Sequence, residues 1–462
     1  FLIFTKLGLF AISAFAGMAC YFAVKGNSAE TASFEVKQAA LHSYTYRRET
    51  AFDAEPTLMA RAESPVDLSG DALGIIYILQ RDGKLLRAGD PLANQLATST
   101  SYASLADENT IPGLGFSSIA FHPGFLDKES VGFGKFYVVV AEKPKSGTPD
   151  FLPEFGPGIE HHQDVLYEYI TPFPLAASFK GSRREVMRFS QPGAENNLGS
   201  IVFDQHGHLY LAIGDGAAGK VSNESPSRNA SSLTSAYGKV LRIDPTGSNS
   251  VSGHYGIPET NPFKMISGAL PELWAFGLRA PHSLHFDPFH RMLCIGESAI
   301  NGTEEINLSA LGGEHFGWDL NHGSLFFNLA AKAELDSLVT QPKLSLNRQS
   351  GLIGRNTGNV VYRGERFPAL AGKLIFASHD GQLLACDPQE GSTPGSPLKV
   401  LDLGCLAEKQ FAALRTTPMG ELVVLCDDGS VYEMRKNHEV GSGKARKRAL
   451  YCLAERFLGS ES

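Results

Sequence analysis

Short apolar runs alternate with turn residues over most of the chain, from about residue 65 onward. Residues 74–79 read Gly-Ile-Ile-Tyr-Ile-Leu and lead into the turn Asp82-Gly83, and residues 134–140 read Gly-Lys-Phe-Tyr-Val-Val-Val. Runs rich in β-branched and aromatic residues between Gly, Asp and Pro predict β-strands. The same pattern returns over residues 117–123, 201–213, 283–296 and 411–432.

The spacing of these runs favours one architecture. They recur every several tens of residues without long helical periodicity, which predicts a β-propeller built from four-stranded blades. Asp427-Asp428-Gly429, between two of the late runs, is a hairpin signal. A β-sandwich is the alternative all-β fold, but a chain of 462 residues would need two of them. The composition agrees with many short strands, because 48 Gly and 25 Pro stand beside only 19% charged residues.

The N-terminus does not follow this pattern. Residues 1–25 are almost wholly apolar, with charges only at Lys6 and Lys25, and from Leu7 onward they are long enough for about one bilayer crossing. We therefore expect a retained single-span membrane anchor that would make the protein a single-pass membrane protein. A secretory signal peptide is the alternative, although residues 27–29 form a poor cleavage site. Orientation and compartment, an organelle inner membrane or the cell surface, stay open because the two lysines bracket the span.

Two further segments lie outside the repeating pattern. Residues 26–60 are polar and mixed, which predicts a linker before a propeller over residues 61–436. Residues 437–462 begin with a flexible basic stretch and continue into apolar positions at helical spacing, namely Leu450, Leu453, Ala454, Phe457 and Leu458. This tail is expected either to fray or to form an amphipathic helix that docks on a partner or on an anionic membrane.

Charge and cysteine usage exclude two classes of function. The formal net charge of −8 argues against an electrostatic nucleic-acid binder. The six cysteines show no CxxC pair and no Cys/His spacing suited to zinc. Neither feature points to a particular partner.

The motifs are more specific than the composition. Residues 195–200 read Glu-Asn-Asn-Leu-Gly-Ser, a strand pair follows, and the segment closes on Gly214-Asp215-Gly216. Further short motifs stand before this segment, at residues 113–123, and after it, at residues 237–244, 257–263, 271–281, 304–307, 315–318 and 361–364. Together they resemble the glucose/sorbosone dehydrogenase family, which includes soluble quinoprotein sugar dehydrogenases and Hedgehog-interacting-protein-like proteins. The resemblance covers about residues 65–436 and implies a six-bladed propeller.

The resemblance assigns three catalytic positions. In the active family a His and an Asp act at the sugar C1, and an Arg lies over the quinone cofactor, pyrroloquinoline quinone (PQQ). These positions correspond to Asn196, Asp215 and Arg279 in this chain. A carboxamide lacks the basicity by which an imidazole takes a proton from a sugar hydroxyl. For Asp215, which lies between two glycines, a structural role in a turn is the alternative.

The positions that would hold the cofactor have also changed. The family's Asn beside the arginine is Ala280, its lysine is Asp380, and its Arg-x-Arg pair falls on Gln410 and Ala412. Each hydrogen bond to a charged group contributes about 1.5–3 kcal/mol, so losing three cations removes about 5–9 kcal/mol of binding to the three carboxylates of PQQ. A register slip of one residue would put His379 at the lysine position but restore neither arginine.

The implied calcium site is less altered. The family holds Ca²⁺ on a loop that here includes Glu297, Ser298, Ala299 and Glu304. Carbonyls and carboxylates suit this ion, so a weak site is possible in this loop. If the protein is active, the resemblance implies PQQ and calcium as cofactors; otherwise we expect none.

The sequence thus predicts a membrane-anchored, catalytically silent sugar-dehydrogenase-like propeller. It would serve as a structural or accessory subunit with protein partners in a membrane assembly. One alternative is a PQQ-dependent oxidoreductase acting on an aldose or another alcohol. Another is an extracellular module that binds carbohydrate or another ligand.

Overall fold

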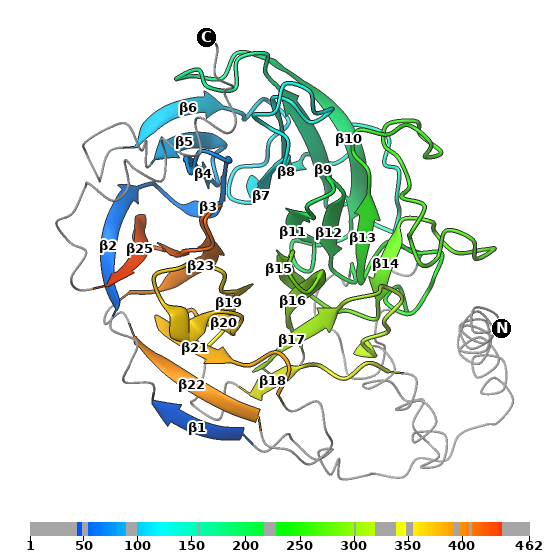
Figure 1. Ribbon diagram of the computed structural model, residues 1–462. Helices are drawn as coiled ribbons and strands as arrows, with labels where there is room; N and C mark the ends of the chain where they lie inside the picture. Colours follow the sequence, from blue (N-terminus) through cyan, green and yellow to red (C-terminus); the bar gives the residue numbers. More distant parts are fainter. Residues whose placement is uncertain are drawn as a thin grey trace, which may run out of the picture.

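Six β-sheets stand around one central axis (Figure 1). The computed structural model describes residues 44–48, 54–88, 99–154, 158–216, 228–299, 302–318, 339–347, 354–390, 398–405 and 409–436. The expected all-β six-bladed propeller is confirmed.

Within each blade the strands follow chain order from the axis outward, except that one N-terminal strand is added at the outer edge of each of the last two blades. The first four blades are β3–β6 (Pro65–Gly70, Ile76–Gln80, Lys84–Ala88, Thr100–Ser104), β7–β10 (Phe116–Phe121, Lys135–Glu142, His162–Ile170, Ser182–Gln191), β11–β14 (Leu198–Phe203, Leu209–Ile213, Lys239–Ile243, Leu273–Phe276) and β15–β18 (Pro281–Asp287, Met292–Ser298, Thr303–Ser309, Leu344–Asn347). The fifth contains β19–β22 (Asn356–Val361, Leu374–Ser378, Gln382–Cys386, Leu398–Cys405) with β1 (Tyr44–Arg48), and the sixth contains β23–β25 (Phe411–Thr416, Leu422–Cys426, Ser430–Lys436) with β2 (Ala54–Arg61). A 3₁₀ turn, η4 (Pro368–Leu370), precedes β20.

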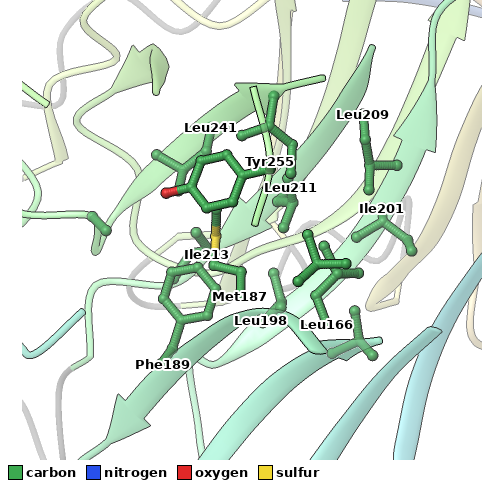
Figure 2. Packing of buried hydrophobic residues seen from close by; sticks show 14 of the residues in the cluster. Leu166, Met187, Phe189, Leu198, Ile201, Leu209, Leu211, Ile213, Leu241 and Tyr255 are labelled. Atoms are coloured by element: carbon green, nitrogen blue, oxygen red, sulfur yellow. The ribbon is translucent and has the colours of Figure 1, made fainter. Parts of the chain in front are cut away.

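The core is divided among the blade interfaces. Six clusters of buried apolar side chains each join two neighbouring blades, so the ring has a hydrophobic contact at every junction. Figure 2 shows the one in which Leu166 and Met187 of the second blade meet Leu198 and Leu211 of the third. Because each blade packs on both faces, middle strands such as β4 are buried at every position. This explains why they are continuous apolar runs in the sequence.

The six innermost strands share one irregularity. In each, the pairing with the second strand shifts by one residue near the strand start, as between Leu198 and Ser200 in β11. A β-bulge of this kind redirects a side chain. The residues left out of the register form a ring at one end of the axis: Val66, Ser117, Gly199, His282, Thr357 and Ala412.

The ring is closed by a segment that the sequence analysis assigned to a linker. β2 pairs antiparallel with β25 and supplies the outer strand of the sixth blade, and β1 adds to β22 in parallel. The linker expected over residues 26–60 is therefore wrong where these strands lie. The sequence of β2 contains Pro56 and two charged residues, so it lacks a clear strand pattern. As an outermost strand it tolerates this composition, and Ala60 is nonetheless fully buried.

Two predictions concern the ends of the chain. The anchor over residues 1–25 and the tail over residues 437–462 lie outside the described residues. Within the part of the chain that is described, no helix has the length and apolar character needed to cross a bilayer.

Candidate functional site

The residues singled out in the sequence lie at one end of the propeller, where the innermost strands begin. Asn196 precedes β11 and Asp215 follows β12, and these two strands are antiparallel, so both residues lie at the same end. The corresponding connections in other blades bring Arg279, Ala280, Glu297, Ser298, Ala299, Glu304, Asp380, Gln410 and Ala412 to this end. The ring of bulged residues lies here as well. We call this region the candidate-site end.

Asn196 and Asp215 are in direct contact. The Asn196 side-chain amide Nδ2 donates a hydrogen bond to Asp215 Oδ1 at 3.0 Å. Asn196 has a φ of +56°, the left-handed region that Asn, Asp and His tolerate better than most residues. An imidazole would thus be compatible with this backbone, and the Asn keeps the conformation without the basicity.

Asp215 is fully buried and held from several sides. Its second carboxylate oxygen, Oδ2, accepts a hydrogen bond from Trp318 Nε1 at 2.8 Å. Its backbone N–H donates to Arg279 O at 2.9 Å, and its carbonyl accepts from Asn229 Nδ2 at 3.1 Å. Both carboxylate oxygens therefore accept from side chains distant in sequence, which is more than a turn between two glycines requires.

Arg279 contacts the same tryptophan that binds the Asp215 carboxylate. Its guanidinium carbon is 5.4 Å from the centroid of the Trp318 ring, within the range of a cation–π contact. One guanidinium nitrogen donates to Ser298 O at 3.1 Å, and the Arg279 backbone N–H donates to Glu297 Oε2 at 2.9 Å. The arginine thus connects Trp318 to the loop expected to hold calcium.

Buried carboxyl groups accompany that loop. Glu297 accepts hydrogen bonds from Asn307 Nδ2 at 2.7 Å and from the Arg279 backbone. Ser298 Oγ donates to Glu304 at 3.1 Å, and the Ala299 backbone N–H donates to Thr303 O at 2.8 Å. Burial, followed by the neighbouring Glu305 carboxylate, raises the pKa of Glu297 well above its ordinary value of 4.5.

A polar cavity of about 350 Å³ occupies the part of this end formed by blades five and six. It is lined by Asp380, Lys409, Gln410, Asp427 and Asp428. Lys409 Nζ lies 2.5 Å from Asp428 Oδ2, and this ammonium lowers the pKa of Asp428 to about 2. The Asp427 backbone N–H donates to Gln410 O at 2.9 Å, and Ser378 Oγ donates to Asp380. Carboxylates therefore outnumber cations among the lining residues.

Comparison with known proteins identifies the family. A family model described as Glucose / Sorbosone dehydrogenase matches residues 180–441, more than half of the chain. The chain belongs to the glucose/sorbosone dehydrogenase family. HIPL1 protein of Arabidopsis thaliana is 28% identical over 60% of this chain and 45% of its own length. Aldose sugar dehydrogenase YliI of Escherichia coli is 27% identical over 50% of this chain and 57% of its own length.

Solved structures agree with the propeller fold. The soluble aldose sugar dehydrogenase of Escherichia coli in its apo form has a TM-score of 0.59 at 21% identity, covering 82% of this chain and 98% of its own. The PQQ-bound form of the aldose sugar dehydrogenase from Streptomyces coelicolor has a TM-score of 0.56 at 16% identity, covering 83% and 98%. In sequence, the chain spans about half the length of the curated relatives it matches.

The residues at the family's cofactor positions do not fit PQQ. Asp380 and Gln410 line the polar cavity, whereas Ala412 occupies the bulge of β23 and is not among the lining residues. None of the three can pair with a carboxylate as a cation does. The one-residue slip does not help, because it would replace only the lysine by His379 and would restore neither arginine.

In the loop where the resemblance implies calcium, oxygen atoms already accept hydrogen bonds from other residues of the chain. Glu297 accepts from a backbone N–H and from Asn307, and Ser298 O accepts from the Arg279 guanidinium. No group of three His, Cys, Asp or Glu side chains suited to a metal occurs among the described residues. Arg279 thus places a positive charge where the family resemblance puts the ion, and the donor set is poor for Ca²⁺.

Sequence reasoning missed several residues at this end. Asp427 and Asp428 were interpreted only as a hairpin signal. Lys409 immediately precedes Gln410, one of the two positions at which the resemblance implies arginine. Arg81, from the first blade, lies near enough to Arg355 that burial and this second guanidinium lower the pKa of Arg81. Nothing in the local sequence marks these residues, since only blade packing brings them to one place.

His282 is a further residue whose place was not foreseen. It is the bulged residue of β15, and its Nε2 lies 3.8 Å from Glu304 Oε2. In the sequence, no motif or spacing separates His282 from the other histidines. Its position could have been recognised from the start of the strand, because in every innermost strand the bulged residue is the second one.

The buried Glu297 predicts a pH-dependent stability. Because its folded pKa is raised, the folded protein keeps a proton that the unfolded chain releases above pH 4.5. Stability should therefore fall, by on the order of 1–3 kcal/mol, as the pH rises from 5.5 to 8.5. Glu297→Gln should flatten this slope in urea denaturation, whereas the exposed Glu365→Gln should not. An unchanged slope in Glu297→Gln would contradict the assignment.

Proposed function

We propose that this chain is a catalytically silent family member that acts as an accessory or interaction module. One observation carries the proposal. At the position of the family's catalytic base, the carboxamide of Asn196 donates a hydrogen bond to Asp215. A group that donates to this carboxylate and has no basic nitrogen cannot accept the proton of a sugar hydroxyl. Loss of a general base costs a factor of about 10²–10⁴ in rate.

The charge of the cavity supports the same conclusion. Asp380 and Gln410 line it together with Asp427 and Asp428, and Lys409 is paired. A trianionic quinone would meet carboxylates where it needs cations. By the hydrogen-bond values used above, affinity would fall by on the order of 10³–10⁶.

An oxidation assay tests the proposal directly. The purified full chain, supplied with PQQ, Ca²⁺, an aldose and a dye acceptor, should show no turnover above the protein-free rate. Gel filtration should leave no quinone absorbance with the protein. The aldose sugar dehydrogenase of Escherichia coli serves as the positive control. Turnover that Asp215→Ala abolishes would instead establish a PQQ-dependent oxidoreductase.

The variant Asn196→His separates the effect of the missing general base from the effect of the missing cofactor-binding cations. The left-handed backbone at this position accepts a histidine, so the variant should fold and regain an imidazole beside Asp215. It should still bind no PQQ, because the cavity keeps its carboxylates. Sugar oxidation by this single variant would show that the cofactor positions matter less than proposed.

The accessory role in a membrane assembly is the second element of the proposal. It is supported by the apolar residues 1–25 and by the basic tail of residues 437–462 in the sequence. Detergent extraction followed by sizing should give a particle much larger than the 49.8 kDa chain. A monodisperse monomer would refute the subunit role without bearing on catalysis.

A ligand-binding module is the second candidate, and the polar cavity favours it. Its 350 Å³ volume lies in the range of small-molecule sites. Carboxylate and amide oxygens accept hydrogen bonds from hydroxyl groups, so a neutral sugar suits the lining better than an anion. Saturation-transfer NMR with free aldoses should then show binding that Asp427→Ala weakens. No saturation transfer from the wild type would exclude this alternative.

A further inference from the structure

A second concave surface lies at the opposite end of the propeller. It is about 510 Å³ in volume and is formed by the β3–β4, β7–β8 and β9–β10 connections of the first two blades. These connections follow the ends of the strands that begin at the candidate-site end. We call it the basic apolar groove; it is lined by Leu73, Leu126, Lys128, Phe133, Pro172, Phe173, Pro174, Leu175, Ala176 and Lys180.

The lining of this groove combines two kinds of surface. Eight of the ten lining residues are apolar, and among them Phe173 is 60% and Leu175 is 48% exposed. The other two are lysines, Lys128 and Lys180, and none of the described residues that line the groove is acidic. Asp127 and Glu129 flank Lys128 in sequence but are not part of the lining. In a chain with a net charge of −8, this is a local site of positive charge beside apolar walls.

We propose that the basic apolar groove binds an anionic single-chain amphiphile, such as a long-chain carboxylate. The acyl chain would cover Phe173 and Leu175, and the acid group would meet Lys128 and Lys180. Charge complementarity selects an acid over an alcohol or an amine. Concave, mostly apolar sites of this volume suit small ligands. A stable protein interface uses about 20–30 residues on each side, more than this groove supplies. This proposal is independent of whether the candidate-site end is catalytic.

A fluorescent fatty acid tests the proposal. Cis-parinaric acid, below its micellar concentration, should bind the full chain saturably with a stoichiometry of one. Decanoate should compete about fifteenfold less well than dodecanoate, because it has two methylenes fewer and each buried methylene strengthens binding about fourfold. Lys128→Ala with Lys180→Ala should weaken binding of the acid about three- to tenfold. The methyl ester of the same probe should not distinguish this double variant from the wild type.

A matched pair of variants tests the location. Leu175→Glu places a carboxylate in the groove and should weaken binding more than tenfold. Leu311→Glu makes the same change at another exposed leucine, 79% exposed, in the β17–β18 connection, and should leave binding unchanged. Circular dichroism melting of both variants shows whether each remains folded.

Several results would overturn the proposal. One is the absence of saturable binding, and another is equal weakening by Leu175→Glu and Leu311→Glu. Sedimentation with phosphatidylglycerol vesicles that depends on Leu175, without binding of the monomeric acid, would assign the groove to a bilayer surface. A dimer that Leu175→Glu dissociates would assign it to a second copy of the chain.

Discussion

Removing residues 1–61 should abolish cooperative folding, whereas removing residues 1–53 should leave a folded propeller. The difference between the two truncations is β2, which pairs with β25 along its whole length. β2 also contributes Met59 and Ala60 to the apolar cluster that joins the sixth blade to the first. Without it, the last blade loses its outer strand and the junction that closes the ring loses part of its core.

The size of this effect follows from the architecture. A propeller without β2 exposes the edge of β25 and loses Met59 and Ala60 from the apolar cluster at the ring closure. Since a single large-to-small change in a core already costs about 2–5 kcal/mol, the combined loss is comparable with a typical domain stability of about 5–15 kcal/mol. β1, by contrast, is an added outer strand on a blade that already has four. Its loss should leave all six junctions intact.

Circular dichroism melting and limited proteolysis measure the two outcomes. The shorter truncation should give one cooperative transition and a protease-resistant core. The longer one should give no cooperative transition or an insoluble product. If both truncations melt alike, β2 does not close the ring and the propeller is held by its blade interfaces alone.

Lys239→Met should lower the free energy of unfolding by about 3–5 kcal/mol. The Lys239 ammonium is fully buried and donates to the carbonyls of Asn229, Ala230 and Tyr237 at 2.6–2.7 Å. Methionine keeps the aliphatic stem but leaves these carbonyls without their charged donor. A buried acceptor that loses its partner costs about 1–3 kcal/mol.

The same lysine positions the candidate site. It orders the stretch that contains Asn229, whose side chain donates to the Asp215 carbonyl. Urea denaturation should therefore show the loss of stability for Lys239→Met and almost none for Lys399→Met, an exposed lysine in β22. Equal stability of the two variants would mean that water replaces the ammonium in the cage of carbonyls.

The candidate site was predictable in part. The family resemblance groups Asn196, Asp215 and Arg279 at one site. In the structure the Asn196 side chain donates to the Asp215 carboxylate, and the Asp215 backbone N–H donates to Arg279 O. Trp318, which binds the second oxygen of Asp215, belongs to a matched motif but carried no assigned role. Lys409, Asp427 and His282 were missed because their neighbours in space come from other blades.

The propeller architecture and the residue types expected at the site could be predicted from the sequence alone. Turn residues and apolar runs are local signals, so they predict strands and their recurrence. The absence of an imidazole at Asn196, where the family resemblance implies one, is likewise a matter of residue identity. Only the tertiary structure shows that residues 54–61 complete the ring, since they pair with Ser430–Lys436 at the other end of the described chain. Only the structure shows that Asn196 donates to Asp215 and that the Arg279 guanidinium donates to Ser298 O. Only the structure shows that Lys128 and Lys180 line one groove together with apolar residues. Contacts between blades depend on packing of distant segments, and local sequence patterns carry no record of them.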